Sequence, residues 1–295
     1  MKKFIIFCIG SILVLLLLAI AFENTIIFNS STSGASKFYR ILNDNDSQEI
    51  PIFGSSRAKR NYMPSVLGEH YYNYGVEGVQ DNVVLFFLEE ELAKDRETPI
   101  IINYDLDGVN SVIGDIKNYL PFLSNPKVVA LVKKDMKPHY YVPYAAYFGH
   151  FEAYVKDYLN ESLQQTEVAD QGAALLKGAV DEATFKKYVK DRDNSTLVVK
   201  HDAELYAKYL ELCKSTDRKV LFVVSPNHVS YTNSIQNNEE NLKFFNELKA
   251  IDNVTVINFS SVIYPDKNFF NTTHLNYLGA EVFSYELKDS LAKYL

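Results

Sequence analysis

The chain has 295 residues, of which 47% are hydrophobic, and a formal net charge of −7. This length and composition suit one large folded domain, or a domain with a sizeable insertion, and they exclude a chain dominated by low-complexity disorder. The acidic balance leaves no broad basic surface, so nucleic acid is not expected as a partner.

Residues 1–22 carry two lysines at their start and continue as an apolar run without charge. The run is long enough to cross a bilayer, and the lysines before it favour a cytoplasmic N-terminus. An uncleaved single-pass membrane anchor is therefore predicted, which would place the rest of the chain in the periplasm or at the cell surface. The alternative is a signal peptide, because Ala19-Ile20-Ala21 fits a small-x-small cleavage site, and the protein would then be secreted.

Residues 23–47 are polar and rich in serine, and they predict a linker between the membrane and the folded domain. The domain itself is expected to occupy residues 48–295. In its first part, short apolar strands bounded by turn residues alternate with helical patterns. The expected elements are strands at 49–53, 70–74 and 99–104, a crossover at 58–67 and an amphipathic helix at 80–96.

The same alternation returns late in the chain. Helices are expected at 201–214, 239–250 and 280–294, and apolar strands at 220–224 and 254–257. Short apolar strands separated by amphipathic helices predict an α/β fold with a parallel sheet covered on both faces. Ligands of such sheets bind at the carboxyl ends of the strands.

Residues 108–200 interrupt this alternation. They are rich in tyrosine, including Tyr119, Tyr140 and Tyr147, and show no clean strand pattern. We interpret them as a helical and aromatic insertion that caps the site and shapes its specificity. The alternative is a helical subdomain packed on the sheet edge, since aromatic residues suit sugar stacking but are also common in cores.

Two segments carry residue types suited to acyl chemistry. Gly54-Ser55-Ser56-Arg57 follows the first expected strand, where a turn of small residues can expose one hydroxyl at the sheet edge. Asn271-Thr272-Thr273-His274 precedes the last expected helix, and its histidine is placed to deprotonate that hydroxyl. The other interpretation of the first segment is an ordinary helix cap formed by Ser55 or Ser56.

These motifs resemble those of the SGNH/GDSL hydrolase superfamily over residues 49–107 and 219–295, and Gly-Ser-Ser-Arg is similar to the turn of membrane-anchored bacterial members associated with cell-envelope or polysaccharide acyl groups. The resemblance implies a flavodoxin-like three-layer αβα sandwich, with Ser56 as the nucleophile and His274 as the general base. It requires no cofactor. No metal site is expected either, because Cys8 and Cys213 are isolated and Asp105-Leu106-Asp107-Gly108 lacks the later ligands of a calcium loop.

The resemblance also implies an oxyanion hole made by the backbone N–H groups of Ser56 and Gly78. The Gly-x-Asn-Asp element of the family is not recognisable after the third strand. Asn103 or Asn110 is therefore the candidate for the asparagine side chain that would add a third donor.

The family's aspartate, three residues before the histidine, is replaced here by Asn271. A neutral amide can orient an imidazole, but it cannot stabilise the imidazolium that forms during catalysis. We therefore expect a dyad of Ser56 and His274 oriented by Asn271. The alternative is a carboxylate from elsewhere, for which Asp266 is the nearest candidate in sequence.

Two further residues are candidates for substrate binding. Arg57 can bind an anionic group of the substrate or pair with an acidic neighbour. His228 follows the strand at 220–224 and can contact the substrate, although a loop histidine without a catalytic role is the simpler interpretation.

The function expected from the sequence is that of an extracytoplasmic serine esterase or O-acyltransferase. Its substrate would be an acyl ester, for instance an acetyl ester, of a cell-surface polysaccharide or another carbohydrate. Hydrolysis and transfer use the same residues, so the sequence does not separate them. The alternative is a catalytically impaired module that binds glycan or helps to assemble an envelope complex, and the sequence identifies no protein partner.

Overall fold

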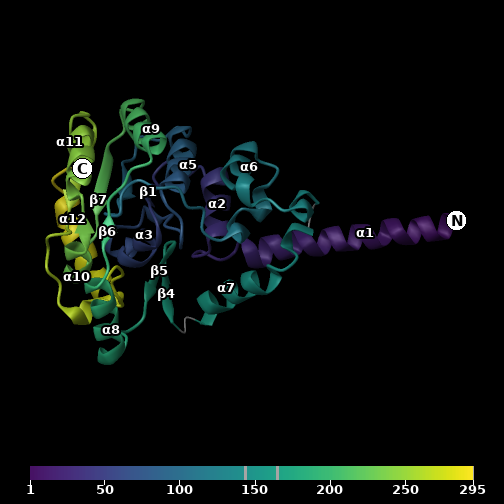
Figure 1. Cartoon of the computed structure of the whole chain (residues 1–295). Helices are drawn as coiled ribbons and strands as arrows, with labels where there is room; N and C mark the ends of the chain where they lie inside the picture. The colour runs from purple at the N-terminus through teal and green to yellow at the C-terminus, as the bar shows by residue number, and fades with distance from the viewer. Residues whose placement is uncertain (143–144, 164–165, 295) are drawn as a thin grey trace.

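The computed structural model describes residues 1–142, 145–163 and 166–294. Its centre is a five-stranded sheet in which every neighbouring pair of strands is parallel, with helices on both sides (Figure 1). The strands lie in the order β2 (Tyr71–Asn73), β1 (Ile50–Phe53), β3 (Ile100–Asn103), β7 (Val220–Val224) and β9 (Val254–Asn258). This is the order of a doubly wound sheet, and it confirms the predicted α/β architecture with a parallel sheet.

Alternate residues of the strands enter two separate cores, one on each face of the sheet. Ile100 and Ile102 of β3 belong to one core and Ile101 to the other, which explains the uninterrupted apolar run of this strand. One face is covered by α2 (Gly34–Asn43), α5 (Asp81–Leu92), α9 (Ala203–Lys214) and α11 (Asn238–Lys249). The other is covered by α3 (Ser56–Asn61), α4 (Pro64–Leu67) and α12 (Tyr277–Leu291).

The N-terminal helix α1 (Lys2–Phe22) projects away from the rest of the molecule (Figure 1), and none of its residues is buried. It continues through a π-helical turn, Glu23–Ile27. Within the described ranges, this is the one helix long and apolar enough to cross a membrane.

The prediction of a polar linker at 23–47 was wrong. Ile27 is buried, and α2 places Phe38 and Ile41 in the main core. Ser33 caps this helix by accepting a hydrogen bond from the Ser36 N–H at 3.1 Å. The serines of this segment therefore begin a packed helix instead of forming a tether.

The insertion contains more regular structure than its sequence pattern predicted. Its described helices are α6 (Pro126–Val132), α7 (Phe151–Leu163) and α8 (Glu182–Asp193). Short 3₁₀ turns lie before α6, at 116–118 and 120–122, and between α6 and α7, at 133–135, 138–141 and 145–147. An antiparallel hairpin, β4 (Glu167–Asp170) and β5 (Ala173–Leu176), was not expected. Short strand β6 (Leu197–Val198) also pairs with β8 (Ile235–Gln236) outside the insertion.

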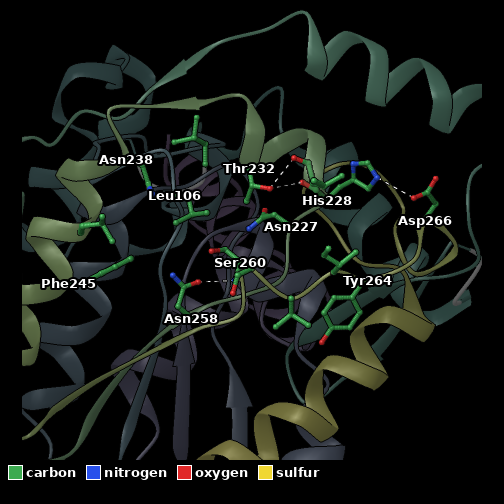
Figure 2. A pocket seen from close by; sticks show the side chains of 16 residues that line it. Leu106, Asn227, His228, Thr232, Asn238, Phe245, Asn258, Ser260, Tyr264 and Asp266 are labelled. Carbon is green, nitrogen blue, oxygen red and sulfur yellow. Dashed lines mark hydrogen bonds and ion pairs between the residues drawn. The ribbon is translucent and has the colours of Figure 1, made fainter.

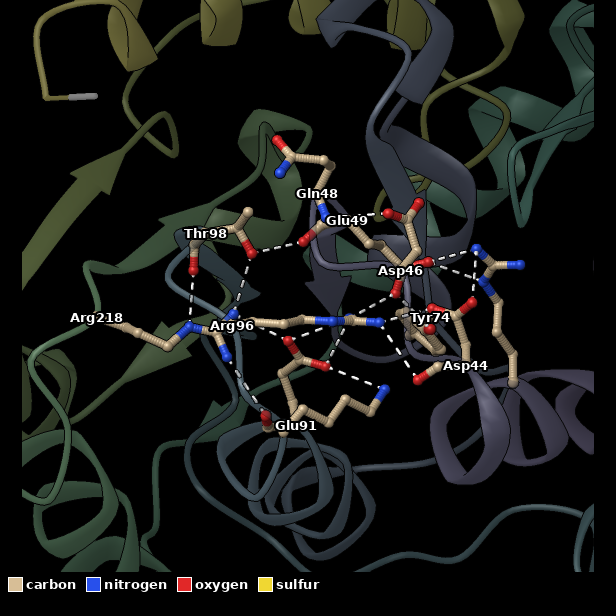
Figure 3. Close-up of polar contacts among 11 residues, drawn as sticks. Asp44, Asp46, Gln48, Glu49, Tyr74, Glu91, Arg96, Thr98 and Arg218 are labelled. Atoms are coloured by element: carbon tan, nitrogen blue, oxygen red, sulfur yellow. Dashed lines mark hydrogen bonds and ion pairs between the residues drawn. The ribbon is translucent and has the colours of Figure 1, made fainter.

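A buried ionic network joins the amino ends of the central strands (Figure 3). Arg96 contacts Glu49 at 3.1 Å, Glu91 at 3.0 Å and Asp44 at 2.7 Å. Arg218, just before β7, contacts Glu91 at 2.9 Å. The network holds β1, β7, α2 and α5 together at the edge opposite the carboxyl ends of the strands, where the candidate site lies.

Candidate active site

The turn between β1 and α3 separates the roles of its two serines. Ser55 is the N-cap of α3: its hydroxyl accepts a hydrogen bond from the Arg57 N–H at 3.2 Å and donates one to Asp105. Gly54 has a φ of +152°, and a Cβ added there would lie 2.7 Å from the Ala58 Cβ, so the turn requires glycine. Because Ser55 performs the capping, the hydroxyl of Ser56 is free to face the histidine loop.

The histidine loop connects a 3₁₀ turn, Asp266–Asn268, to α12. Asn276 caps α12 by accepting a hydrogen bond from the Gly279 N–H at 3.0 Å. A Cβ on Gly279 would come within 2.1 Å of the Asn268 carbonyl oxygen, so glycine allows the helix to pack against the start of the loop. The residues that follow His274 therefore close the loop that presents it.

Ser56 and His274 are brought together as the sequence predicted. The Nε2 atom of His274 lies 2.9 Å from the Ser56 Oγ. Asn61, on the same helix as Ser56, accepts a hydrogen bond from the Leu275 N–H at 2.9 Å and thereby fixes the loop against α3. Asn61 was not predicted as a site residue. The sequence offers one hint, because asparagine is unfavourable inside a helix and its presence there suggests another role.

The amide of Asn271 determines which nitrogen of His274 carries a proton. Its Oδ1 accepts hydrogen bonds from the backbone N–H groups of Thr273 and His274, both at 2.9 Å. The orientation of the amide is therefore fixed, and its Nδ2 donates to His274 Nδ1 at 3.1 Å. The neutral ring must then carry its proton on Nε2, which donates to Ser56. In this tautomer, the histidine cannot act as a base toward Ser56.

The surroundings of His274 also disfavour its charged form. Burial lowers the pKa of His274 to about 4, the positive charges of Arg57 and Arg60 act in the same direction, and Glu77 opposes them. The imidazole is thus neutral at physiological pH. It is a weaker base than an ordinary histidine, since the imidazolium is costly at this place.

Two backbone N–H groups are available for an oxyanion. Neither the N–H of Ser56, in the first turn of α3, nor that of Gly78 has a hydrogen-bond partner within the described part of the chain. Gly78 has a φ of +72°, a conformation that favours glycine. These are the two backbone donors that the resemblance implied.

The side chains expected to add a third donor do not fit that role. The Asn103 amide donates to Asp105 at 2.7 Å and accepts a hydrogen bond from the Tyr62 hydroxyl at 2.9 Å. The Asn110 amide donates to the carbonyl oxygens of Asp107 and Gly108. Both amides are held by the protein itself, so neither is assigned to the oxyanion hole.

Arg57 pairs with acidic neighbours, which was one of its two expected roles. Its guanidinium contacts Asp105 at 2.7 Å and Asp107 at 3.2 Å, and it donates to the Tyr231 hydroxyl at 2.7 Å. These contacts explain the acidic pair after β3. They also leave Arg57 as a largely buried support of the turn that carries Ser56, so the assignment to substrate binding is not supported.

His228 and Asp266 belong to a different pocket, of about 480 Å³, at the carboxyl ends of β7 and β9 (Figure 2). His228 caps the short helix α10 (Val229–Asn233), and its Nδ1 accepts a hydrogen bond from the Ser230 N–H at 3.2 Å. Its Nε2 lies 3.3 Å from Asp266. Asp266 therefore pairs with His228 and not with His274, so it does not supply the missing carboxylate, and His228 does not contact the dyad.

Two cavities are lined by residues that neighbour the dyad in sequence or contact it, although neither is lined by Ser56 or His274 themselves. An open groove of about 410 Å³ is lined by Asn271 and by Tyr188 and Arg192 of α8, so the insertion does form one wall near the site. A cavity of about 260 Å³ is lined by Arg60 and Glu77 together with side chains of α7.

No protein-family model matches the chain. No curated protein matches it either. Among the solved structures that are similar is a chain described as "a putative platelet activating factor from Streptococcus pneumonia", with 12% sequence identity and a TM-score of 0.41 over 93% of this chain and 98% of that chain. A likeness this low establishes neither a shared family nor a shared activity.

Proposed function

We propose that this protein is a membrane-anchored, SGNH-type serine esterase or O-acyltransferase that acts on acyl esters of carbohydrate outside the cytoplasm. The observation that carries the proposal is the 2.9 Å contact between Ser56 Oγ and His274 Nε2. The N–H groups of Ser56 and Gly78, which have no hydrogen-bond partner among the described residues, are the proposed donors to the oxyanion. A nucleophile, a base within hydrogen-bond reach and donors for an oxyanion are the parts that acyl transfer needs.

The reaction would begin with the Asn271 amide leaving its contact with Nδ1, so that the imidazole proton can move from Nε2 to Nδ1 through solvent. Ser56 Oγ then attacks the acyl carbon while its proton passes to Nε2, and the N–H groups of Ser56 and Gly78 hold the oxyanion. The leaving alcohol takes that proton as the acyl-serine forms. Water or a sugar hydroxyl then attacks the acyl-serine and regenerates Ser56.

The proposed substrate class is supported by the two cavities lined by Asn271 and by Arg60. Both are lined mainly by polar and charged side chains, including Arg192, Arg60 and Glu77. Such walls suit a hydroxyl-rich sugar better than an apolar lipid ester. The proposed location outside the cytoplasm is supported by Lys2 and Lys3 at the start of α1.

A second candidate function is favoured by Asn271. Its amide holds His274 in the tautomer that donates to Ser56, which is the arrangement expected of an inactive site. The chain would then be a binding module that retains the shape of an esterase without its turnover.

A fluorophosphonate probe separates the two candidates. The full chain in lipid nanodiscs is treated with the probe and analysed by intact mass, beside Ser56→Ala, His274→Ala and, as a control histidine exposed on the surface, His70→Ala. An esterase predicts one label per chain in the wild type and in His70→Ala, and none in the other two variants. Absence of label from a folded wild type would reject the esterase proposal.

A further inference from the structure

Four large apolar side chains are exposed where the insertion meets the base of α1. They belong to residues 133–142 and 145–151, here called the collar. Their exposed fractions are 70% for Tyr141, 54% for Val142, 83% for Phe148 and 55% for Phe151. Single exposed apolar residues are normal on protein surfaces, whereas a group of them next to a hydrophobic helix indicates a surface that is covered in use.

The collar is fastened to the last turn of α1. The ring of Phe151 stacks on Phe22 with 4.3 Å between the centroids, and the Tyr147 hydroxyl donates a hydrogen bond to Glu23. Figure 1 shows α1 leaving the molecule directly from the region of α6 and α7, which flank the collar in sequence. The position of the collar along the axis of α1 is thus fixed by contacts.

The length of α1 determines where these contacts would lie relative to a bilayer. Its 21 residues span about 30 Å, which matches the hydrocarbon thickness of a bilayer. With α1 in a membrane, Phe22 and Glu23 lie at the boundary between hydrocarbon and headgroups. Aromatic side chains at this level are the usual interfacial anchors of membrane proteins.

The charge of the collar fits the same surroundings. Lys133, Lys134 and Lys137 are exposed beside the aromatic residues, against one acidic side chain, Asp135. In a chain whose net charge is −7, this is a local basic group. Aromatic and apolar side chains next to lysines are the combination that binds an anionic lipid surface.

A cavity continues the apolar surface inward. It has a volume of about 430 Å³ and lies between the collar and the end of α1. Its lining includes Glu23, Leu120, Met136, Tyr141 and Val142. Two of the four exposed side chains, Tyr141 and Val142, therefore also line a recess next to the end of α1.

We propose that the collar rests in the headgroup region of the same bilayer that holds α1. Its aromatic side chains enter the interface, and its lysines lie against anionic lipid phosphates. The domain would then be seated on the membrane in one orientation instead of hanging from it. This inference depends on α1 spanning a membrane and is independent of the chemistry proposed for Ser56.

The chain contains no tryptophan, so a single introduced tryptophan reports on its own position. The full chain carrying Phe148→Trp is placed in nanodiscs whose lipids are brominated on the acyl chains. Phe7→Trp in α1 is the reference inside the membrane. Ile263→Trp, at a residue 85% exposed on the loop between β9 and the turn before the histidine loop, is the matched reference in water.

We expect the brominated lipid to quench Phe148→Trp several-fold more than Ile263→Trp, as it does Phe7→Trp. Emission from Phe148→Trp that matches Ile263→Trp would overturn the proposal. So would protection of that tryptophan from aqueous acrylamide without quenching by lipid, because a protein partner would then cover the collar.

The lysines are tested in the Phe148→Trp chain by changing Lys133, Lys134 and Lys137 to glutamine together. Nanodiscs with anionic phosphatidylglycerol are compared with nanodiscs of phosphatidylcholine alone. The chain with its lysines should be quenched more strongly in the anionic lipid, and the triple variant should lose this difference. Equal quenching of the unaltered collar in both lipids would overturn the proposed contact with anionic lipid.

Discussion

Asn271 differs from aspartate by one group, an NH₂ in place of an oxygen, and that group faces the Nδ1 atom of His274. An aspartate there would accept a hydrogen bond from a protonated Nδ1 and leave Nε2 free to take the proton of Ser56. The amide does the opposite, because its oxygen accepts hydrogen bonds from two backbone N–H groups and its NH₂ group is thereby turned toward the ring. A single side chain thus sets the direction of the hydrogen bond between His274 and Ser56.

We expect Asn271→Asp to increase the rate of fluorophosphonate labelling and of ester hydrolysis. In another triad enzyme, replacing the aspartate by asparagine lowers turnover by about four orders of magnitude, because the histidine adopts the same tautomer. The increase in rate expected here is therefore at most about four orders of magnitude. The measurement is the labelling rate of the variant beside wild type and Asn271→Ala. An unchanged or lower rate in Asn271→Asp would show that the tautomer is not the barrier.

The low pKa of His274 predicts a pH dependence. Labelling by the wild type should stay constant down to about pH 5 and fall as the ring is protonated near its pKa of about 4. An acid limb near pH 6.5, the ordinary value for histidine, would contradict the buried, cation-rich surroundings described here.

The lowered pKa of His274 also makes the stability of the fold depend on pH. Because the folded pKa lies below the unfolded one, the unfolded chain binds the proton first as the pH falls. The free energy of unfolding should therefore decrease between about pH 6.5 and pH 4, and His274→Gln should remove this part of the pH dependence. Urea unfolding across this range gives the measurement.

At the scale of elements, the sequence predicted the parts that depend on local periodicity. The five strands and the helices α5, α9, α11 and α12 are confirmed, because their apolar residues repeat with the period of a strand or a helix. The hairpin β4–β5 was missed because β4 carries charged residues at both ends. Helix α2 was missed because its serine-rich start is typical of a linker as well as of a helix cap.

In the candidate site too, some parts could be predicted from local sequence and others could not. The turn after β1 and the loop before α12 were predicted from their motifs, and both lie at the carboxyl edge of the sheet. The partners of Arg57 and Asp266 were not predictable, because they are determined by tertiary packing between distant segments. Tyr231, for example, lies 174 residues from the guanidinium that it contacts.

The buried network around Arg96 predicts the effect of a single neutral substitution. Glu91 is fully buried and contacts both Arg96 and Arg218, so Glu91→Gln leaves two guanidinium groups without their shared charge. We expect a loss of about 3–5 kcal/mol in the free energy of unfolding.

The control for this loss is Glu90→Gln, which removes a contact with Lys127 at the surface. That change should cost less than about 1 kcal/mol. Equal midpoints for both variants in urea would show that the network adds little to stability.

At the scale of the whole molecule, one carboxylate joins the segment that follows α1 to the insertion. Glu161 of α7 accepts hydrogen bonds from Ser30, Ser31 and Thr32, just beyond the π-helical turn. Burial raises the pKa of Glu161, but the hydrogen bonds from Ser30 and Ser31 outweigh it, and the pKa is lowered overall. The charged form therefore holds this connection at neutral pH.

We expect Glu161→Ala to expose residues 29–33 to proteases in the full chain, because the turn loses the acceptor that orders it. Limited proteolysis in nanodiscs, followed by mass analysis of the fragments, measures the change. Glu152→Ala, at an exposed position in the first turn of α7, is the matched control and should leave the rate unaltered. Identical cleavage of the two variants would contradict this role of Glu161.

The π-helical turn after α1 also decides where a soluble version of the protein can begin. Phe22 and Ile26 pack against the main core, and Ile27 is buried in it, so the folded domain starts within the helix and not after it. A recombinant chain cut at residue 28 or later would lack these side chains and expose their binding surface to water. A chain that begins at Phe22 would instead omit most of the apolar span and keep the three side chains, Phe22, Ile26 and Ile27, that cover this part of the core.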